Sequence, residues 1–202
     1  MARSILLLFL LAALHPRKEP VMKTGEAGDG PAYTASGELK LPERYREWIF
    51  LTAGIDMNYS ATNDAAHSVF DNVFVNPSAY KTFLETGTWP DKTVILLEIR
   101  TAEGATSINK RGHTQSPKIN DLEAHVKDNS RNGWTFYGFD NSVSGKPFQR
   151  SANCYSCHEQ HGIVDTTFVQ FYPTLLGIAK DKQTIHPDLL KELAPPASTE
   201  PK

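Results

Sequence analysis

The chain has 202 residues, of which 40% are hydrophobic and 22% are charged, a composition typical of a globular protein with a buried core. Its 23 acidic and 21 basic residues leave a formal charge of −2, which excludes the basic surplus that a nucleic-acid partner requires. No stretch reaches the ~18 consecutive apolar residues of a membrane-spanning helix, so no membrane span is predicted either.

The first residues have the pattern of an export signal. One positive charge, at Arg3, precedes ten consecutive apolar residues from Ile5 to Leu14. Such an apolar run is too short to span a bilayer and is typical of a secretory signal peptide. We therefore predict a signal peptide over residues 1–14 and a periplasmic, exported protein. A retained signal anchor and the start of a buried helix are the alternatives.

Composition also divides the remainder of the chain. Residues 15–36 contain Pro, Gly, Lys, Glu and Asp with little apolar periodicity, which predicts a linker. Residues 194–202 are rich in Pro, Ser and Thr, which predicts a disordered tail. The sequence between them, residues 37–193, is expected to form one domain.

The domain combines strand-like runs with one clearly delimited helix. Runs rich in β-branched and aromatic residues predict strands over 48–52, 69–75, 93–100 and 134–139. Asn76 is a suitable N-cap, Pro77 suits the first helical position, and Gly87 can end the helix. Shorter helices are expected over 42–46 and around the two cysteines. The fold class is therefore predicted to be α+β, a mainly antiparallel sheet with a few helices.

Glu98 lies on the strongest of these predicted strands. A period of two places it on the same face as Leu96 and Arg100, opposite Leu97 and Ile99. An acid among apolar neighbours can act as a proton acceptor with a raised pKa. A salt bridge to Arg100 or another nearby base is the alternative, and the sequence leaves both open.

The two cysteines of the chain lie in one motif, Cys154–Tyr155–Ser156–Cys157–His158. Two thiols separated by two residues on one helical turn can reach both vinyl groups of a haem, and the next residue places an imidazole beneath the iron. This C-x-x-C-H pattern marks c-type haem attachment, and export agrees with it. We predict one haem c bonded to Cys154 and Cys157, with His158 as an axial iron ligand.

The motif has three alternative interpretations. A redox dithiol would need an exposed cysteine of low pKa, usually in a βαβ context that this sequence lacks. A zinc site would need His161 as a fourth ligand, which crowds a tetrahedral centre. A structural disulfide is the third.

The second axial position of the iron is predicted to be open. The motif comes late in the chain and no methionine follows it, so only Met57 is a candidate thioether ligand within the domain. The candidate histidines, each better explained as a surface or hydrogen-bonding residue, are His67, His113, His125 and His186. An iron with an open position can bind small molecules and perform chemistry on them.

These motifs together resemble the cytochrome P-460 family, which includes hydroxylamine-oxidising cytochromes and the cytochromes c′-beta. The resemblance runs from Leu41 to about Leu175. Its segments, in the order and with the gaps of the family, are 41–48, 70–77, 87–91, 134–139 and 154–158.

The resemblance implies a mainly antiparallel fold, a homodimer and a five-coordinate haem iron with His158 as the proximal ligand. In the enzymes of the family a lysine is also cross-linked to the haem. Ser78 stands at the aligned position here, and Lys81 lies about one helical turn further on. Arg46 matches an arginine near the haem pocket, so Arg46 and Glu98 are predicted as the catalytic residues that handle charge and protons.

Three functions are therefore predicted in competition. The first is redox chemistry on a small nitrogen compound, hydroxylamine or nitric oxide, with a redox partner protein. The second is a module like cytochrome c′-beta that binds a diatomic gas without turnover, and the third is a simple electron carrier. Because Ser78 stands where the enzymes of the family have the cross-linked lysine, the second function is favoured over hydroxylamine oxidation.

Overall fold

The computed structural model describes residues 28–57, 68–140 and 142–194. The predicted signal peptide, the larger part of the predicted linker, His67 and all of the predicted tail beyond residue 194 lie outside these residues. Within them, no helix is long and apolar enough to cross a membrane.

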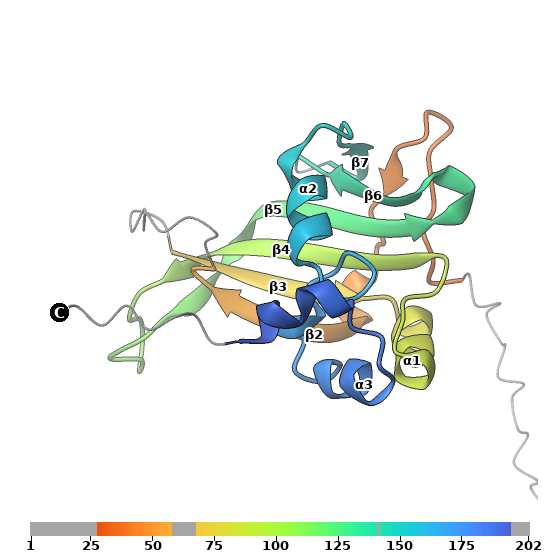
Figure 1. The fold of residues 1–202 in the computed structure, drawn as a ribbon. Helices are drawn as coiled ribbons and strands as arrows, with labels where there is room; N and C mark the ends of the chain where they lie inside the picture. The colour runs from red at the N-terminus through yellow and green to blue at the C-terminus, as the bar shows by residue number, and fades with distance from the viewer. Residues whose placement is uncertain (1–27, 58–67, 141, 195–202) are drawn as a thin grey trace, which may run out of the picture.

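The core of the fold is one seven-stranded antiparallel sheet with the order β1-β7-β6-β5-β4-β3-β2 (Figure 1). Its strands are β1 (Leu39–Lys40), β2 (Ile49–Ile55), β3 (Val69–Val75), β4 (Thr93–Glu103), β5 (Thr114–Asp128), β6 (Gly133–Gly138) and β7 (Ser144–Pro147). The predicted antiparallel α+β fold is confirmed. Each of the four predicted strands is present, because each concentrates the β-branched and aromatic residues that fit a pleated surface.

The helices are few and short. They are α1 (Pro77–Thr86), α2 (Asn153–His161) and α3 (Leu176–Asp181), with 3-10 turns η1 (Tyr45–Glu47), η2 (Asn129–Arg131), η3 (Val169–Phe171) and η4 (Pro187–Leu193). α1 begins at Pro77 and ends before Gly87, whose φ of 77° is the left-handed conformation that glycine adopts easily. The helix predicted over 42–46 is wrong, because only the single 3-10 turn η1 forms there.

The two faces of the sheet carry different cores. On one face, Leu51, Val75 and Ile95 pack with α1, α3 and the segment after α2. On the other face, Val94 and Leu96 pack against Leu39 and Tyr45, together with buried residues of β5 and β6. The alternation of side chains predicted for β4 is therefore confirmed, because Ile95 belongs to one core and its neighbours Val94 and Leu96 belong to the other.

Part of the segment predicted as a linker is folded onto the domain. The Asp29 carboxylate accepts a hydrogen bond from the Ser78 backbone N–H at 2.7 Å and so caps the N-terminus of α1. The Tyr33 hydroxyl donates to Asp128 at 2.9 Å, and Tyr33 forms a bridge with Leu39. The folded unit therefore begins before the expected boundary at Gly37.

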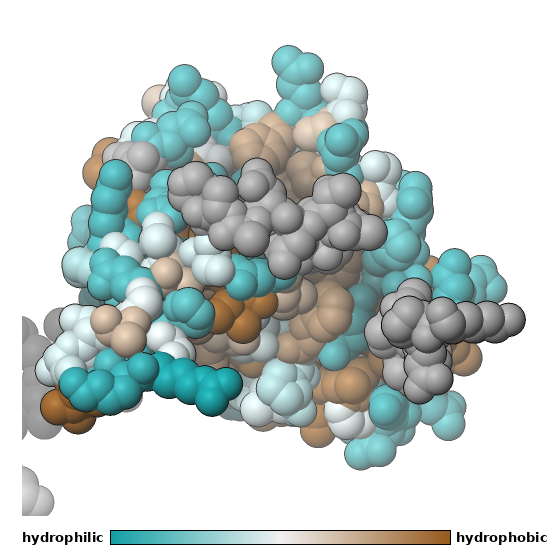
Figure 2. All heavy atoms as spheres, turned by 90° about the vertical axis from the view of Figure 1, so that its left-hand side faces the viewer, coloured by the Kyte–Doolittle hydropathy of each residue, from teal (hydrophilic) through white to brown (hydrophobic). Residues whose placement is uncertain are grey.

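The surface is mainly hydrophilic, with apolar side chains gathered in limited areas. Figure 2 shows apolar side chains near the centre of one face, between hydrophilic margins. On the edge strand β2, Phe50 and Ile55 are about half exposed. Single exposed apolar residues are normal for a globular protein, so these two residues do not by themselves indicate a binding site.

Candidate functional site

A large cavity lies between the sheet and α2, which crosses in front of β4 and β5 in Figure 1. Its volume is about 560 Å³, within the range of about 300–1,000 Å³ in which proteins hold cofactors and other small molecules. One wall is formed by inward-facing residues of β2 to β6, the other by α2 and the segment around η3. Among the lining residues are Val73, Ile95, Leu97, Ile99, Phe136, Cys154, Cys157, His158 and Phe168. The wall is thus mainly apolar, and the polar groups on it are few.

α2 brings the three predicted haem-binding residues to this cavity. Cys154 and Cys157 are three residues apart on the helix and therefore share one face, and His158 follows on the same side. All three line the cavity. The cysteines are not joined in a disulfide, and both are only partly buried.

The orientation of His158 is fixed by the turn that follows α2. Its Nδ1 lies 2.8 Å from the Thr166 carbonyl oxygen. A carbonyl can only accept, so Nδ1 carries the proton and Nε2 is left with a lone pair that can bind a metal. Burial lowers the pKa of His158, only partly offset by this hydrogen bond, and so favours the neutral imidazole that serves as a ligand.

Aromatic rings hold the His158 imidazole in place. Phe168 lies 4.1 Å from it between ring centroids, Phe136 4.7 Å and His125 4.9 Å, the last two edge to face. Burial lowers the pKa of His125 well below its ordinary value, so this residue is neutral as well. Two imidazoles that touch edge to face cannot hold one iron from opposite sides, which excludes His125 as the ligand across from His158.

The cavity has two distinct ends. His158 packs beside β5 and β6, whereas Met57 lies at the end of β2, against Gly54. A Cβ at position 54 would lie 2.2 Å from the Met57 sulfur, so the thioether occupies the space that a side chain at position 54 would take. β3 and β4 separate the two ends, a distance of about 14 Å at ~4.8 Å per strand. The space over β3 and β4 therefore lies between an imidazole at one end and a thioether at the other.

Two carboxylates that were not predicted also line the cavity. Asp71 projects from β3 and Glu123 from β5. Burial, and then the nearby Asp56, raises the pKa of Asp71. Burial, followed by Asp121 and Asp71, raises the pKa of Glu123. Both side chains can therefore hold and release a proton nearer to neutral pH than an ordinary carboxyl group.

The predicted catalytic pair lies on the other face of the sheet. Glu98 is 1% exposed, and its carboxylate accepts hydrogen bonds from the Tyr45 hydroxyl, from Arg100 Nε and from Arg46 at 2.5 Å. Neither Arg46 nor Glu98 is among the described residues that line the cavity. The structure brings the two together but separates them from Cys154, Cys157 and His158.

Of the two alternatives left open for Glu98, the raised pKa is wrong. Burial alone would raise it, but the hydrogen bonds from Arg100 and Tyr45 and the charges of both arginines lower the pKa of this carboxyl group overall. The salt bridge to Arg100 that the sequence left open is present. Burial and the hydrogen bond to Glu98 raise the pKa of Tyr45 to about 12.

The positions considered for a lysine cross-link lie away from the cavity. Ser78 is the second residue of α1, and its hydroxyl donates to Asp29 at 2.5 Å. Lys81 is exposed on the same helix. No residue of α1 and no lysine is among the described residues that line the cavity.

The residues around the cavity fit a covalently bound haem better than the other candidates. Burial raises the pKa of the Cys154 thiol, the reverse of what an active redox dithiol requires. His161 faces Glu192 at 3.2 Å rather than the cysteines, and no described cluster of three or more His, Cys, Asp or Glu side chains could hold a metal ion by itself. Haem supplies four nitrogen ligands of its own, so one oriented imidazole and two thiols in an apolar cavity are sufficient.

Sequence reasoning named Met57 as a candidate thioether ligand, and the structure places it in this cavity, but it missed Asp71 and Glu123 entirely. A signal for Asp71 exists, since it alternates with Val73 on one face of a strand whose other residues are mainly apolar. Nothing in the local sequence indicates that this face lies opposite α2. The signal could be interpreted only once the strand order was known.

Comparison with known proteins agrees with this geometry. The chain matches the family model described as Cytochrome P460 over residues 42–169, which is more than half of its length. A search of curated proteins finds no match. The matched region extends from η1 through the sheet and α2 to the start of η3, and so includes every residue of the cavity described above apart from Phe171 and Tyr172.

Proposed function

Because the chain belongs to the cytochrome P460 family and is thus a haem-binding cytochrome, we propose that it is an exported protein with a single covalent haem c and five-coordinate iron. It binds a small nitrogen compound, hydroxylamine or nitric oxide, at the open iron position and oxidises or reduces it. The observation that carries the proposal is the shared cavity of Cys154, Cys157 and His158, with His158 already oriented by Thr166.

Three residues would hold the haem. The thiols of Cys154 and Cys157 would each add across a vinyl group, with a sulfur–carbon bond formed and the thiol hydrogen taken up by the other vinyl carbon. His158 Nε2 would bind the iron, with its Nδ1–H still donating to the Thr166 carbonyl. The apolar strand residues of the opposite wall, such as Leu97 and Ile99, exclude water from the face of the ring.

The remaining polar residues of the cavity handle protons. When bound, haem iron supplies one-electron chemistry and a position for a small ligand. Oxidation or reduction of hydroxylamine or nitric oxide also moves protons. Asp71 and Glu123, with raised pKa values, can accept or donate them at their carboxyl oxygens. The predicted catalytic roles of Arg46 and Glu98 remain predictions, without support from a cavity position.

Covalent attachment is tested by mass spectrometry of the denatured protein after expression with a c-type haem maturation system. A mass increase of one haem is expected, lost when both Cys154→Ala and Cys157→Ala are introduced. No mass increase in the unsubstituted protein would refute the haem c proposal.

The ferrous spectrum and ligand binding test the iron. An ordinary high-spin haem c spectrum and rapid carbon monoxide binding are expected, because no lysine lines the cavity among the described residues. A strongly red-shifted Soret band would instead show a cross-link and favour the hydroxylamine-oxidising enzymes. Turnover of hydroxylamine with an added electron acceptor then separates an enzyme from a gas-binding module that only holds its ligand.

One observation favours the electron carrier as a second candidate. The Met57 thioether lines the same cavity as His158, and to become the sixth iron ligand it would have to move from the end of β2 to the iron. A low-spin ferrous spectrum that becomes high-spin in Met57→Leu would establish this function in place of the first. A redox partner, a homodimer and the periplasmic location complete the proposal.

A further inference from the structure

A tight turn follows α2 and supplies the hydrogen bond to His158. Val164 and Thr167 pair across it, with the Thr167 backbone N–H donating to the Val164 carbonyl at 2.9 Å. The Thr167 hydroxyl donates to the same carbonyl at 2.7 Å. The two central residues are Asp165 and Thr166, and the Thr166 carbonyl accepts the Nδ1–H of His158.

This turn has an unfavourable backbone for its sequence. Asp165 has a φ of 49° and Thr166 a φ of 57°, both in the left-handed region. Turns with two such residues normally use Asn and Gly, and a β-branched threonine rarely adopts this conformation. The turn does not therefore adopt its shape by local preference, and contacts from elsewhere in the fold must hold it.

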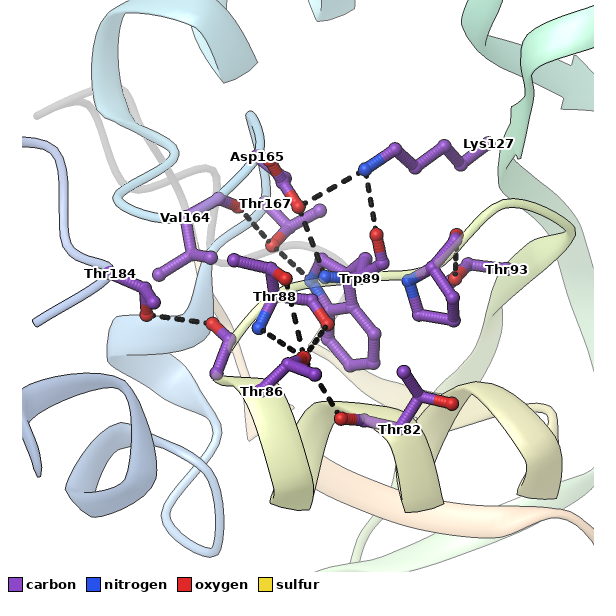
Figure 3. A network of polar contacts seen from close by, with 12 residues as sticks. Thr82, Thr86, Thr88, Trp89, Thr93, Lys127, Val164, Asp165, Thr167 and Thr184 are labelled. Atoms are coloured by element: carbon purple, nitrogen blue, oxygen red, sulfur yellow. Dashed lines mark hydrogen bonds and ion pairs between the residues drawn. The ribbon is translucent and has the colours of Figure 1, made fainter. Parts of the chain in front are cut away.

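Those contacts come from Trp89 and Lys127 (Figure 3). The Asp165 carboxylate accepts hydrogen bonds from the Trp89 backbone N–H at 3.0 Å and from Lys127 Nζ at 3.2 Å. The Trp89 indole N–H donates to the Thr167 hydroxyl at 2.8 Å, and Lys127 Nζ also donates to the Trp89 carbonyl at 2.7 Å. Trp89 is 2% exposed and packs against Phe83, so the turn is bonded to a rigid part of the core.

We propose that Asp165 is a positioning residue for the haem-ligating imidazole. Its carboxylate holds the turn in the left-handed conformation that aims the Thr166 carbonyl at His158 Nδ1. That hydrogen bond increases the electron donation of the imidazole, which strengthens its bond to iron and stabilises ferric over ferrous iron. The inference deepens the proposed function and rests on His158 being the axial ligand.

The test uses the haem-loaded protein with Asp165→Ala and measures the iron–histidine stretching band of the ferrous form by resonance Raman spectroscopy. We expect the band to shift to lower frequency and the midpoint potential to rise. Asp181→Ala, an exposed residue of α3 that loses the same charge, is the matched control and should leave the band unchanged. Asp165→Asn, which keeps an acceptor oxygen in place, should show a smaller shift and covers the case that the alanine variant fails to fold.

A second substitution separates positioning from simple electrostatics. Thr166→Gly removes the side chain that disfavours the left-handed backbone but keeps the carbonyl, so it should restore the band in the Asp165→Ala background. An unshifted band in Asp165→Ala, or a shift that Thr166→Gly does not reverse, would overturn the positioning role. If the unsubstituted protein binds haem but shows no iron–histidine band, the proposed five-coordinate iron bound by His158 fails first, and the two failures are distinguished.

Discussion

Glu98→Gln distinguishes a structural ion cluster from a catalytic acid. The substitution removes the charge of a carboxylate that is 1% exposed and leaves the Arg100 side chain, 10% exposed, beside a neutral amide. Removing one partner of a buried ion pair costs about 3–5 kcal/mol. Arg100 Nη1 still donates hydrogen bonds to the carbonyl oxygens of Ser116 and Pro117, at 2.7 and 2.8 Å, so the arginine keeps part of its pairing. The lower limit of that range, about 3 kcal/mol, is therefore expected.

The loss should be visible as a decrease in melting temperature of about 6–12 °C, at ~2–4 °C per kcal/mol for a domain of this size. It should also depend on pH. The pKa of Glu98 is lower in the folded protein than in the unfolded chain, so its contribution is present above the unfolded pKa and is lost as the pH falls through the folded pKa. The stability difference between the two proteins should therefore narrow in acid.

Urea unfolding followed by circular dichroism measures the effect, with Glu103→Gln, an exposed acid on the same strand, as the control. Ligand binding at the iron should be unchanged, because Glu98 lies on the far face of the sheet. A variant with normal stability and much slower hydroxylamine turnover would refute the structural explanation and support the catalytic one.

Two further predictions concern Gly162, which follows α2, and Glu123, which lines the cavity. Gly162→Ala should destabilise the protein by about 3 kcal/mol, because the new Cβ would lie 2.4 Å from the Thr166 carbonyl carbon. Gly177→Ala is the control, since its Cβ would meet nothing within 4 Å, and it should stabilise α3 by up to ~1 kcal/mol. Urea unfolding measures both effects. Glu123→Gln should be more stable than the unsubstituted protein at neutral pH. The folded protein binds the Glu123 proton more tightly than the unfolded chain does. The stability of the unsubstituted protein therefore falls as the pH rises from the unfolded pKa of Glu123 to its raised folded pKa. Unfolding measured from acid to neutral pH should show that advantage growing with pH, whereas a constant difference, or one shared by the exposed Glu85→Gln, would contradict it.

The sequence predicted those parts of the fold whose signals are local. Helix α1 is delimited by Asn76, Pro77 and Gly87, and the C-x-x-C-H motif alone indicated which residues would hold a haem. β5 was missed although it is the longest strand, because its first half is polar and contains Pro117. Its apolar alternation begins only at Leu122.

The residues that complete the site depend on contacts between distant parts of the chain. Glu98 was placed on the correct face of β4, but its partner Tyr45 is 53 residues away, and only the packing of η1 shows that the acid is paired. The anchoring of the turn at Asp165 likewise depends on Trp89, 76 residues earlier. Neither contact leaves a periodic signal in the sequence.

The cap that Asp29 provides for α1 has a consequence for the maturation of the protein. Cleavage before Asp29 keeps both the cap and the Tyr33–Asp128 hydrogen bond, whereas cleavage after Tyr33 removes both. A cut between Asp29 and Tyr33 would remove the cap alone, so the two contacts distinguish successive positions at which the chain could be cut.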